Sequence, residues 1–220
     1  MVTTITLPIE QSTALTTALQ FLAADEAIIA PTDTVYGLMC RFDRPQAIDK
    51  LYAIKGRPPE KAIPVLIGDP GQLAQLTAEP IAPLTQALAA HFWPGPLTLV
   101  VPALSTLPAV LTARQPTVGV RLPNHAWLRT LLRQSGPLAA TSANRSGQPE
   151  AHTVAEILAQ LGSRLPLIIV DATLEQRDHT HVLPSTVVAI EADQRVQLLR
   201  PGPISQQVRH FLQERFGLSC

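Results

Sequence analysis

The sequence predicts an α/β (α+β) protein with a twisted, mixed β-sheet and surrounding helices. Short apolar runs typical of buried strands alternate along the chain with stretches whose apolar residues recur at helical spacing. The 220 residues are 46% hydrophobic and 15% charged, a composition typical of a folded protein with a sizeable core. The 21 prolines and 11 glycines form no linker and no repeat, so we predict a single domain over residues 1–220.

The individual elements follow from this periodicity and from their end signals. We expect strands at residues 27–30, 63–67, 97–101, 118–122, 138–141, 167–170 and 186–190. We expect helices at 9–24, 45–54, 124–134, 153–161 and 204–216, with one more opening at Asp69-Pro70. Pro45 and Gly56 mark the two ends of the second helix, and Thr153 with Glu156 predicts a capping box. The strand order cannot be read from these patterns.

Charge and cysteine content restrict the class of protein. Lys plus Arg and Asp plus Glu both number 17, so no net charge attracts nucleic acid or anionic lipid. The N-terminus lacks the basic and apolar regions of a secretory signal, and no apolar stretch reaches the length of a membrane span. Cys40 and Cys220 lie far apart, so a disulfide is not expected. We therefore expect a soluble, cytoplasmic protein without a membrane partner.

Several common catalytic motifs are absent from the sequence. There is no GxxxxGK[ST] loop, GxGxxG turn, HExxH, CxxC or GxSxG, so a nucleotide would need another kind of site. His179 and His181 lie two residues apart in a polar loop, but no third ligand has metal-site spacing nearby. A solvated loop is favoured there over a metal pair, and we predict no protein metal site.

Two polar segments lie in the first third of the chain, each directly after a predicted strand or helix. The sequence PTDTVYGL at 31–38 follows a buried strand and carries two hydroxyls, a carboxylate and a phenol, although a turn held by Asp33 is the alternative. Lys55, Arg57 and Lys61 lie at the exit of the second helix, with Gly56 between the first two. One cation at a helix end is ordinary, but three within seven residues suit a polyanion better. A solvated basic loop is the competing interpretation.

Two further segments lie later in the chain. TSANRSG at 141–147 ends an apolar strand, where ligands of open α/β sheets commonly bind and where an ST-turn is the alternative. Short hydroxyl and amide groups can bond to phosphate or carboxylate oxygens without crowding. Arg121 and Arg200 each lie beside an apolar run and a proline, which makes a solvated role less natural. A buried salt bridge is the other possibility for them.

Taken in order, these segments resemble the YrdC/TsaC family of threonylcarbamoyl-AMP synthases in its single-domain form. The matching residues are PTDTVYGL at 31–38, KGRP from Lys55, GVRLP at 119–123, TSANRSG at 141–147, Ser185-Thr186 and RPG at 200–202. The resemblance implies a YrdC-like fold with a deep, positively lined cleft. It implies a nucleotidyltransferase that forms threonylcarbamoyl-AMP and pyrophosphate from L-threonine, bicarbonate and ATP, with Mg²⁺ on the triphosphate. A separate transferase would then modify an adenosine next to the tRNA anticodon, so tRNA itself would bind weakly or only indirectly.

The resemblance also implies the roles of individual residues. The threonine-binding residues would be Thr32, Thr34, Tyr36, Arg121, Ser142 and Ser185. The nucleotide-binding residues would be Lys55, Arg57, Lys61, Thr117, Thr141, Asn144 and Arg200, with Lys55 and Arg57 also catalytic through charge stabilisation. The sequence departs from the family at Ala62, Ile63, Leu66 and Glu150, the last standing where a small residue is common. The short segment after Arg200 predicts that the extra C-terminal domain of the longer family branch is absent.

Two other functions compete with this one. A non-catalytic RNA-binding or ribosome-maturation module could use the same cleft, but zero net charge and 4% aromatic residues disfavour it. An enzyme that adenylates a carbamoyl group from carbamoyl phosphate could carry a similar domain, as larger hydrogenase-maturation proteins do. Their acylphosphatase and zinc-finger-like segments are missing from this sequence.

Overall fold

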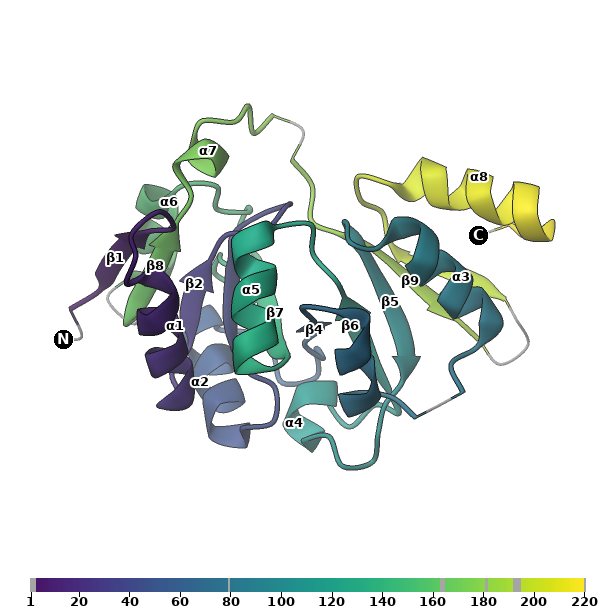
Figure 1. Ribbon diagram of the computed structural model, residues 1–220, viewed down its shortest axis with the longest axis horizontal. Helices are drawn as coiled ribbons and strands as arrows, with labels where there is room; N and C mark the ends of the chain where they lie inside the picture. The colour runs from purple at the N-terminus through teal and green to yellow at the C-terminus, as the bar shows by residue number, and fades with distance from the viewer. Residues whose placement is uncertain (1–2, 79, 163–164, 181, 192–194, 220) are drawn as a thin grey trace.

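The structure, a computed structural model, describes residues 3–78, 80–162, 165–180, 182–191 and 195–219. Its strands form one mixed sheet in the order β1-β8-β2-β3-β7-β4-β6-β5-β9-β10 (Figure 1). The strands are β1 (Ile5–Pro8), β2 (Ile28–Ala30), β3 (Gly37–Arg41), β4 (Val65–Leu66), β5 (Leu97–Pro102), β6 (Thr117–Arg121), β7 (Leu138–Ser142), β8 (Leu167–Val170), β9 (Thr186–Ile190) and β10 (Val196–Arg200). Parallel pairs such as β4 with β6 adjoin antiparallel pairs such as β3 with β7, which confirms the predicted mixed sheet.

Helices cover the sheet on both faces (Figure 1). They are α1 (Ala14–Ala23), α2 (Pro45–Lys55), α3 (Pro83–Phe92), α4 (Ala109–Thr112), α5 (Ala126–Ser135), α6 (Val154–Leu161), α7 (Ala172–Glu175) and α8 (Ser205–Phe216), with a 3₁₀ helix at Pro70–Gln75. Side chains of α1 and α5 pack on one face of the sheet, and those of α2, α4 and α6 pack on the other. A third apolar cluster joins α3 and α8 to β5 and β9.

The sheet separates the two main clusters because successive strand residues point to opposite faces. In β3, Leu38 and Cys40 belong to the cluster beneath α2, whereas Met39 between them belongs to the cluster beneath α1. Burial raises the pKa of the Cys40 thiol well above its ordinary value, so this cysteine stays neutral. Cys220 lies outside the described residues.

The observed helix ends match the predicted ones where the sequence carries strong capping signals. Gly56 follows α2 with φ of 63°, in the left-handed region that glycine adopts without a Cβ penalty, and so turns the chain toward Arg57. Thr153 and Glu156 form the predicted capping box of α6. Among the described helices, none is long and apolar enough to cross a membrane.

Other predicted boundaries are wrong for local reasons. The helix expected from Ile9 begins only at Ala14, because the Ile9 amide still bonds to β8 at the carbonyl of Val170. The strand expected over 63–67 is reduced to Val65–Leu66, since Pro64 has no amide proton for the ladder. The segment after Asp69 is 3₁₀ rather than α-helical, and Asp69 makes no side-chain cap.

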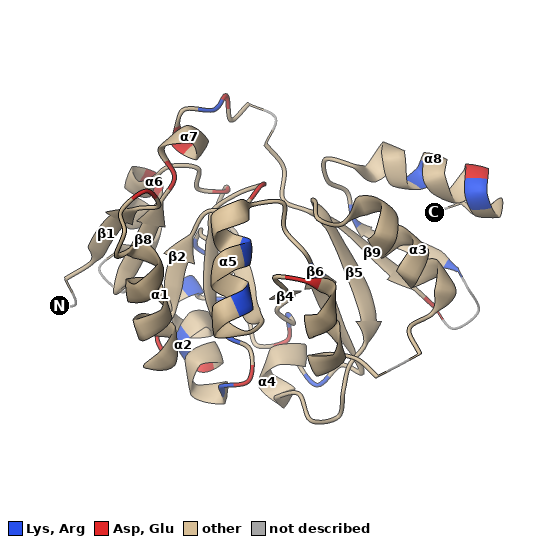
Figure 2. Cartoon of the chain, viewed as in Figure 1, with Lys and Arg blue, Asp and Glu red and all other residues tan. Residues whose placement is uncertain are grey.

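Charged residues are spread along the chain. Figure 2 shows Lys and Arg together with Asp and Glu on both halves of the chain, with neither sign confined to one side of this view. This distribution agrees with the balanced charge of the sequence.

Candidate functional site

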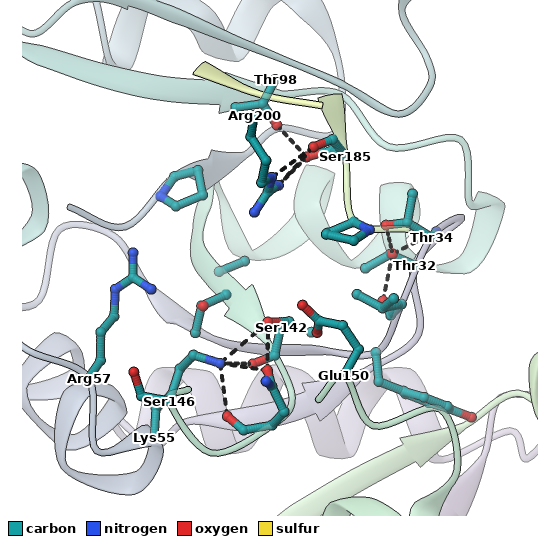
Figure 3. Close-up of a pocket in the computed structure, with 18 of the residues that line it drawn as sticks. Thr32, Thr34, Lys55, Arg57, Thr98, Ser142, Ser146, Glu150, Ser185 and Arg200 are labelled. Carbon is teal, nitrogen blue, oxygen red and sulfur yellow. Dashed lines mark hydrogen bonds between the residues drawn. The ribbon is translucent and has the colours of Figure 1, made fainter. Parts of the chain in front are cut away.

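A cavity of about 320 Å³ lies against the central strands (Figure 3). The last three residues of β7, Ala140, Thr141 and Ser142, line it together with Pro64 and Leu66 of the β4 segment. Part of the cavity wall is therefore the end of the central strands. The remaining walls come from the turn before β3, the exit of α2, the loop after β7, and the segments around Ser185 and Arg200.

The turn before β3 is built around two threonine hydroxyls. Thr32 Oγ1 lies 2.7 Å from the carbonyl oxygen of Val35 and accepts a hydrogen bond from the Thr34 amide at 3.0 Å. Thr34 Oγ1 in turn accepts from Nη1 of Arg121 at 3.0 Å. The turn is therefore fixed to the end of β6 through one arginine.

The Arg121 side chain is buried, and its guanidinium group donates hydrogen bonds to three neighbouring residues. Its Nη2 donates to Oδ1 of Asp33 at 2.5 Å, and its Nε donates to the carbonyl of Gly95 at 3.1 Å. Burial lowers the pKa of Arg121, whereas the charge of Asp33 and its hydrogen bond raise it. The guanidinium carries five N–H groups, so further donors remain for a ligand carboxylate.

Lys55 connects the exit of α2 to the loop after β7. Its Nζ lies 2.6 Å from the Ser142 carbonyl oxygen and 2.8 Å from both the carbonyl and Oδ1 of Asn144. Ser142 Oγ also donates to Asn144 Oδ1 at 2.7 Å. Burial lowers the pKa of Lys55 to about 8, with Glu150 raising it and Arg57 lowering it further.

Two more arginines complete the polar wall. Arg57 donates from Nε and Nη2 to the carbonyls of Lys61 and Ala62 at 2.9 and 2.7 Å. Arg200 donates from Nε and Nη2 to the carbonyl of Ser185 at 3.0 and 2.9 Å. In Figure 3 both guanidinium groups extend toward the same space in the pocket. Burial lowers the pKa of Arg200, the charge of Glu150 raises it, and the charges of Arg121 and Arg57 lower it.

Comparison with known proteins places this arrangement in a family. The Sua5/YciO/YrdC family model, described as telomere recombination, matches residues 20–202. The chain belongs to the Sua5/YciO/YrdC family. The resemblance seen in the ordered motifs is thereby confirmed.

Individual members of the Sua5/YciO/YrdC family are also similar over most of this chain. A threonylcarbamoyl-AMP synthase of Bacillus subtilis (strain 168) is 35% identical over 192 residues, which cover 86% of this chain and 54% of that protein. One from Pseudoalteromonas translucida (strain TAC 125) is 37% identical over 158 residues, covering 71% and 84% respectively. The crystal structure of P. abyssi Sua5 complexed with L-threonine has a TM-score of 0.84 at 30% identity, covering 99% of this chain and 62% of that one. This chain thus spans little more than half of some relatives.

In this Sua5/YciO/YrdC-family chain, the structure brings together every predicted site residue except Thr117. The predicted residues that line the cavity are Thr32, Thr34, Tyr36, Lys55, Arg57, Lys61, Arg121, Thr141, Ser142, Asn144, Ser185 and Arg200. Thr117 is the first residue of β6 and pairs with Pro102. It lies four residues from Arg121, roughly 13 Å along the strand, and does not line the cavity.

Tyr36 and the histidine loop differ in detail from what the sequence indicated. The Tyr36 hydroxyl donates to the backbone carbonyl of Asp171, and its ring is fully buried, so the phenol is held by the protein. His179 stacks on the ring of His152 with 4.7 Å between centroids, and His181 lies outside the described residues. No group of three or more potential metal-binding side chains occurs in the described part of the chain.

Sequence reasoning missed several residues of the site. Thr98 lies inside the apolar run of β5, yet its Oγ1 is 2.8 Å from Oγ of Ser185. The sequence predicts Asp33 only as a turn residue, although it is the ion-pair partner of Arg121. Glu150 was noted as a departure from the family but given no role, and it lines the cavity. Of these three residues, Asp33 and Glu150 could have been predicted from the sequence, because each is a charged residue near a recognised motif. Thr98 carries no such signal.

The cavity is lined by more cationic than anionic side chains. Five lining residues are cationic, namely Lys55, Arg57, Lys61, Arg121 and Arg200, and Glu150 is the one carboxylate among the described lining residues. Mg²⁺ commonly keeps several waters and takes substrate phosphate oxygens together with one or two carboxylates. The five cations suit phosphate groups, so a Mg²⁺ ion held by phosphate oxygens and waters would need no ligand from Glu150 and no dedicated protein cage.

Proposed function

We propose that this chain is an L-threonylcarbamoyladenylate synthase, a nucleotidyltransferase that forms threonylcarbamoyl-AMP and pyrophosphate from L-threonine, bicarbonate and ATP. The observation that carries the proposal is the joining, in one cavity, of two different anion sites. Arg121 with Thr34 suits a small carboxylate, and Arg57 with Arg200 suits a polyphosphate. The names of the relatives and the threonine complex of P. abyssi Sua5 support the same reading over a non-catalytic RNA module.

The threonine subsite follows from the Arg121 hydrogen bonds. Arg121 is held on three sides by Asp33, Thr34 and Gly95, so its remaining N–H groups have a fixed direction. A fixed guanidinium can bind the threonine carboxylate with little loss of side-chain entropy. Ser142 and Ser185 supply hydroxyls around the remaining polar groups of the amino acid.

The nucleotide subsite is formed by Arg57, Arg200 and Lys61. The first two are oriented by backbone carbonyls, so their positive charge is already in place when the triphosphate arrives. Mg²⁺ bound to the triphosphate would neutralise further charge on the phosphate oxygens. Lys55 fixes Ser142 and Asn144 between the two subsites, so it positions the loop as well as contributing charge.

The reaction consists mainly of positioning and charge stabilisation. The free threonine amine and bicarbonate give a carbamate and water, and a carbamate oxygen then attacks the α-phosphorus of ATP. The bond to the β-phosphate oxygen breaks, and its electron pair leaves with pyrophosphate. Preorganised cations stabilise the charge that develops on the phosphate oxygens, and one such group commonly contributes about a hundredfold or more in rate. No protein nucleophile is required.

We further propose the place of this product in the cell. Threonylcarbamoyl-AMP is an activated acyl adenylate, so a separate transferase must consume it, with tRNA as the final acceptor. We expect both proteins to act in the cytoplasm, and tRNA to contact this chain weakly or only indirectly.

The test is pyrophosphate release from MgATP with threonine and bicarbonate each omitted in turn. We expect pyrophosphate and an AMP-linked product only when both are present. Release of ADP and inorganic phosphate would contradict adenylation, and replacement of threonine by carbamoyl phosphate would favour the carbamoyl-adenylating alternative.

A further inference from the structure

Glu150 is an acidic residue in a cavity otherwise lined by cations. It lies in the loop between β7 and α6, and its carboxylate points into the pocket (Figure 3). In this view the carboxylate lies between Ser142 on one side and the Thr32–Thr34 turn on the other. In the same view it lies away from Arg57.

The carboxylate has no partner in the described part of the chain. Its Oε2 atom is buried and accepts no hydrogen bond, and no ion pair joins it to a neighbouring cation. A buried carboxylate oxygen without a donor is costly, and in native structures such an atom is commonly explained by a catalytic role, a bound water or an ion. A purely structural salt bridge does not explain this residue.

The neighbouring cations are engaged elsewhere. Lys55 directs its ammonium group to Ser142 and Asn144, and Arg200 directs its guanidinium group to Ser185. Burial lowers the pKa of Lys55 and of Arg200, and the charge of Glu150 partly offsets this in both cases. Glu150 thus acts on both cations through space while its own oxygens stay available.

We propose that the Glu150 carboxylate binds the ammonium group of L-threonine and so makes the site select an α-amino acid. The inference rests on the proposed function, which places the threonine carboxylate on Arg121. Threonine enters as a zwitterion, and its ammonium group needs an acceptor in a cavity with five cations. Glu150 is the charged acceptor that the described lining residues offer.

The same contact orients the reacting nitrogen. The bound ammonium group releases a proton to solvent, and the free amine then reacts with bicarbonate to give the carbamate and water. The carbamate nitrogen keeps one N–H, which can still donate to Glu150. The new carboxylate on that nitrogen is repelled by Glu150 and attracted by Arg57 and Arg200, so it turns toward the nucleotide.

Equilibrium binding of two ligands tests this inference without any chemistry. L-Threonine and 3-hydroxybutyrate, which lacks only the amino group, are titrated by calorimetry into the full chain without ATP. We expect Glu150→Gln to weaken threonine binding about tenfold or more, as for loss of a charge-assisted hydrogen bond. Binding of 3-hydroxybutyrate should stay unchanged or tighten, and Glu150→Asp should bind threonine with intermediate affinity. Glu60→Gln, an exposed carboxylate outside the cavity, should behave like the wild type.

The other possible outcomes contradict either the proposed function or the role of Glu150. If the wild-type chain binds no threonine at all, the proposed function itself fails. Unchanged threonine binding by Glu150→Gln, or an equal loss for both ligands, would overturn the role of Glu150 alone. Weaker MgATP binding together with a higher Mg²⁺ requirement would instead make Glu150 a metal ligand, which also contradicts the inference. The ammonium role predicts MgATP binding that is unchanged or tighter, because a negative charge has been removed.

Discussion

At the scale of single residues, Lys55 has a structural task that its sequence motif did not reveal. The KGRP motif predicted a phosphate ligand, but the ammonium group is bonded to oxygens of Ser142 and Asn144. The sequence could show that cations gather at this helix exit, since glycine and arginine follow directly. It could not show the acceptors, which lie some 87 to 89 residues later in the chain.

Contacts between residues remote in sequence also decide which other site residues could be predicted. Arg121 and Arg200 could be predicted as functional arginines because an apolar run and a proline flank each of them, although only Arg121 of the two is buried. Thr98 could not, because a threonine in an apolar strand is ordinary and its partner Ser185 is remote in sequence. Thr117 shares the GVRLP neighbourhood but lies at the far end of β6 from the cavity, so its nucleotide role stays a prediction.

Arg57 offers a test of guanidinium geometry against charge. Nε and Nη2 are fixed by the carbonyls of Lys61 and Ala62, which orients the rest of the planar group toward the cavity. A lysine keeps the charge but cannot make both carbonyl bonds and still present a fork to phosphate. We expect Arg57→Lys to lose nearly as much pyrophosphate release as Arg57→Ala, about a hundredfold at saturating ATP and threonine.

The matched control for Arg57 is Arg145→Lys, an exposed arginine in the loop after β7 that does not line the cavity. It should retain wild-type turnover. Full activity of Arg57→Lys would show that charge alone suffices, and full activity of Arg57→Ala would return the segment to a solvated basic loop.

At the scale of elements, the sequence predicted those that form a separate continuous apolar run or whose ends carry strong signals. β8 and β9 were placed at their observed bounds, and α6 differs only at its capping residue, because continuous apolar runs and a capping box are local features. β1, β3 and β10 were not predicted. β1 and β10 lie at the two ends of the sheet, where exposed residues such as Ile5 and Leu199 leave no continuous apolar run. β3 is central, but its short apolar run begins within the polar segment 31–38 and was not separated from it.

Gly202 shows how the turn between β10 and α8 serves the site. A Cβ at this position would lie 2.5 Å from the Thr186 amide nitrogen and 2.7 Å from the Pro184 carbonyl oxygen. These are backbone atoms that cannot move aside easily, so only glycine allows this close approach. The approach brings Arg200 to Ser185.

We therefore expect Gly202→Ala to destabilise the fold by about 1–3 kcal/mol, as overpacking commonly does, and to weaken ATP binding. Chemical denaturation and calorimetric titration of MgATP measure the two effects. Gly71→Ala is the control, since its Cβ would meet only a carboxylate oxygen of Asp69 at 3.1 Å, which can rotate away. Unchanged ATP affinity in Gly202→Ala would show that the turn does not position Arg200.

At the scale of the whole molecule, the spread of charge bears on RNA. Cations and carboxylates balance at 17 each, and neither sign gathers on one side in Figure 2. Affinity for RNA phosphates depends on several cations acting together and falls steeply with salt. We expect tRNA to bind weakly at physiological salt in a filter or anisotropy assay, and pyrophosphate release to be unaffected by stoichiometric tRNA. Submicromolar binding with a steep salt dependence would support the RNA-module alternative.

Stability at alkaline pH depends on several buried groups, among which Lys55, Cys40 and Tyr36 act with different signs. Burial lowers the pKa of Lys55 from 10.5 to about 8, so between these values the unfolded chain binds the extra proton and stability rises with pH. Burial raises the pKa of Cys40 above 9.0, so above that pH the unfolded chain loses a proton first and stability falls. Burial also raises the pKa of Tyr36 from 10.0 to about 12, with the same sign as Cys40.

These windows predict the pH profile of the free energy of unfolding, measured by chemical denaturation from pH 7 to 11. The wild-type chain should gain stability from about pH 8 to 9, stay nearly level to pH 10 while Lys55 and Cys40 oppose each other, and then fall. Each group contributes a slope of about 1.4 kcal/mol per pH unit within its window. Cys40→Ala should keep rising to about pH 10, because the Lys55 effect is then unopposed. Lys55→Met should instead show no rise at all and decline from about pH 9. If Lys55→Met retained the wild-type rise between pH 8 and 9, the lowered pKa of Lys55 would not be its cause.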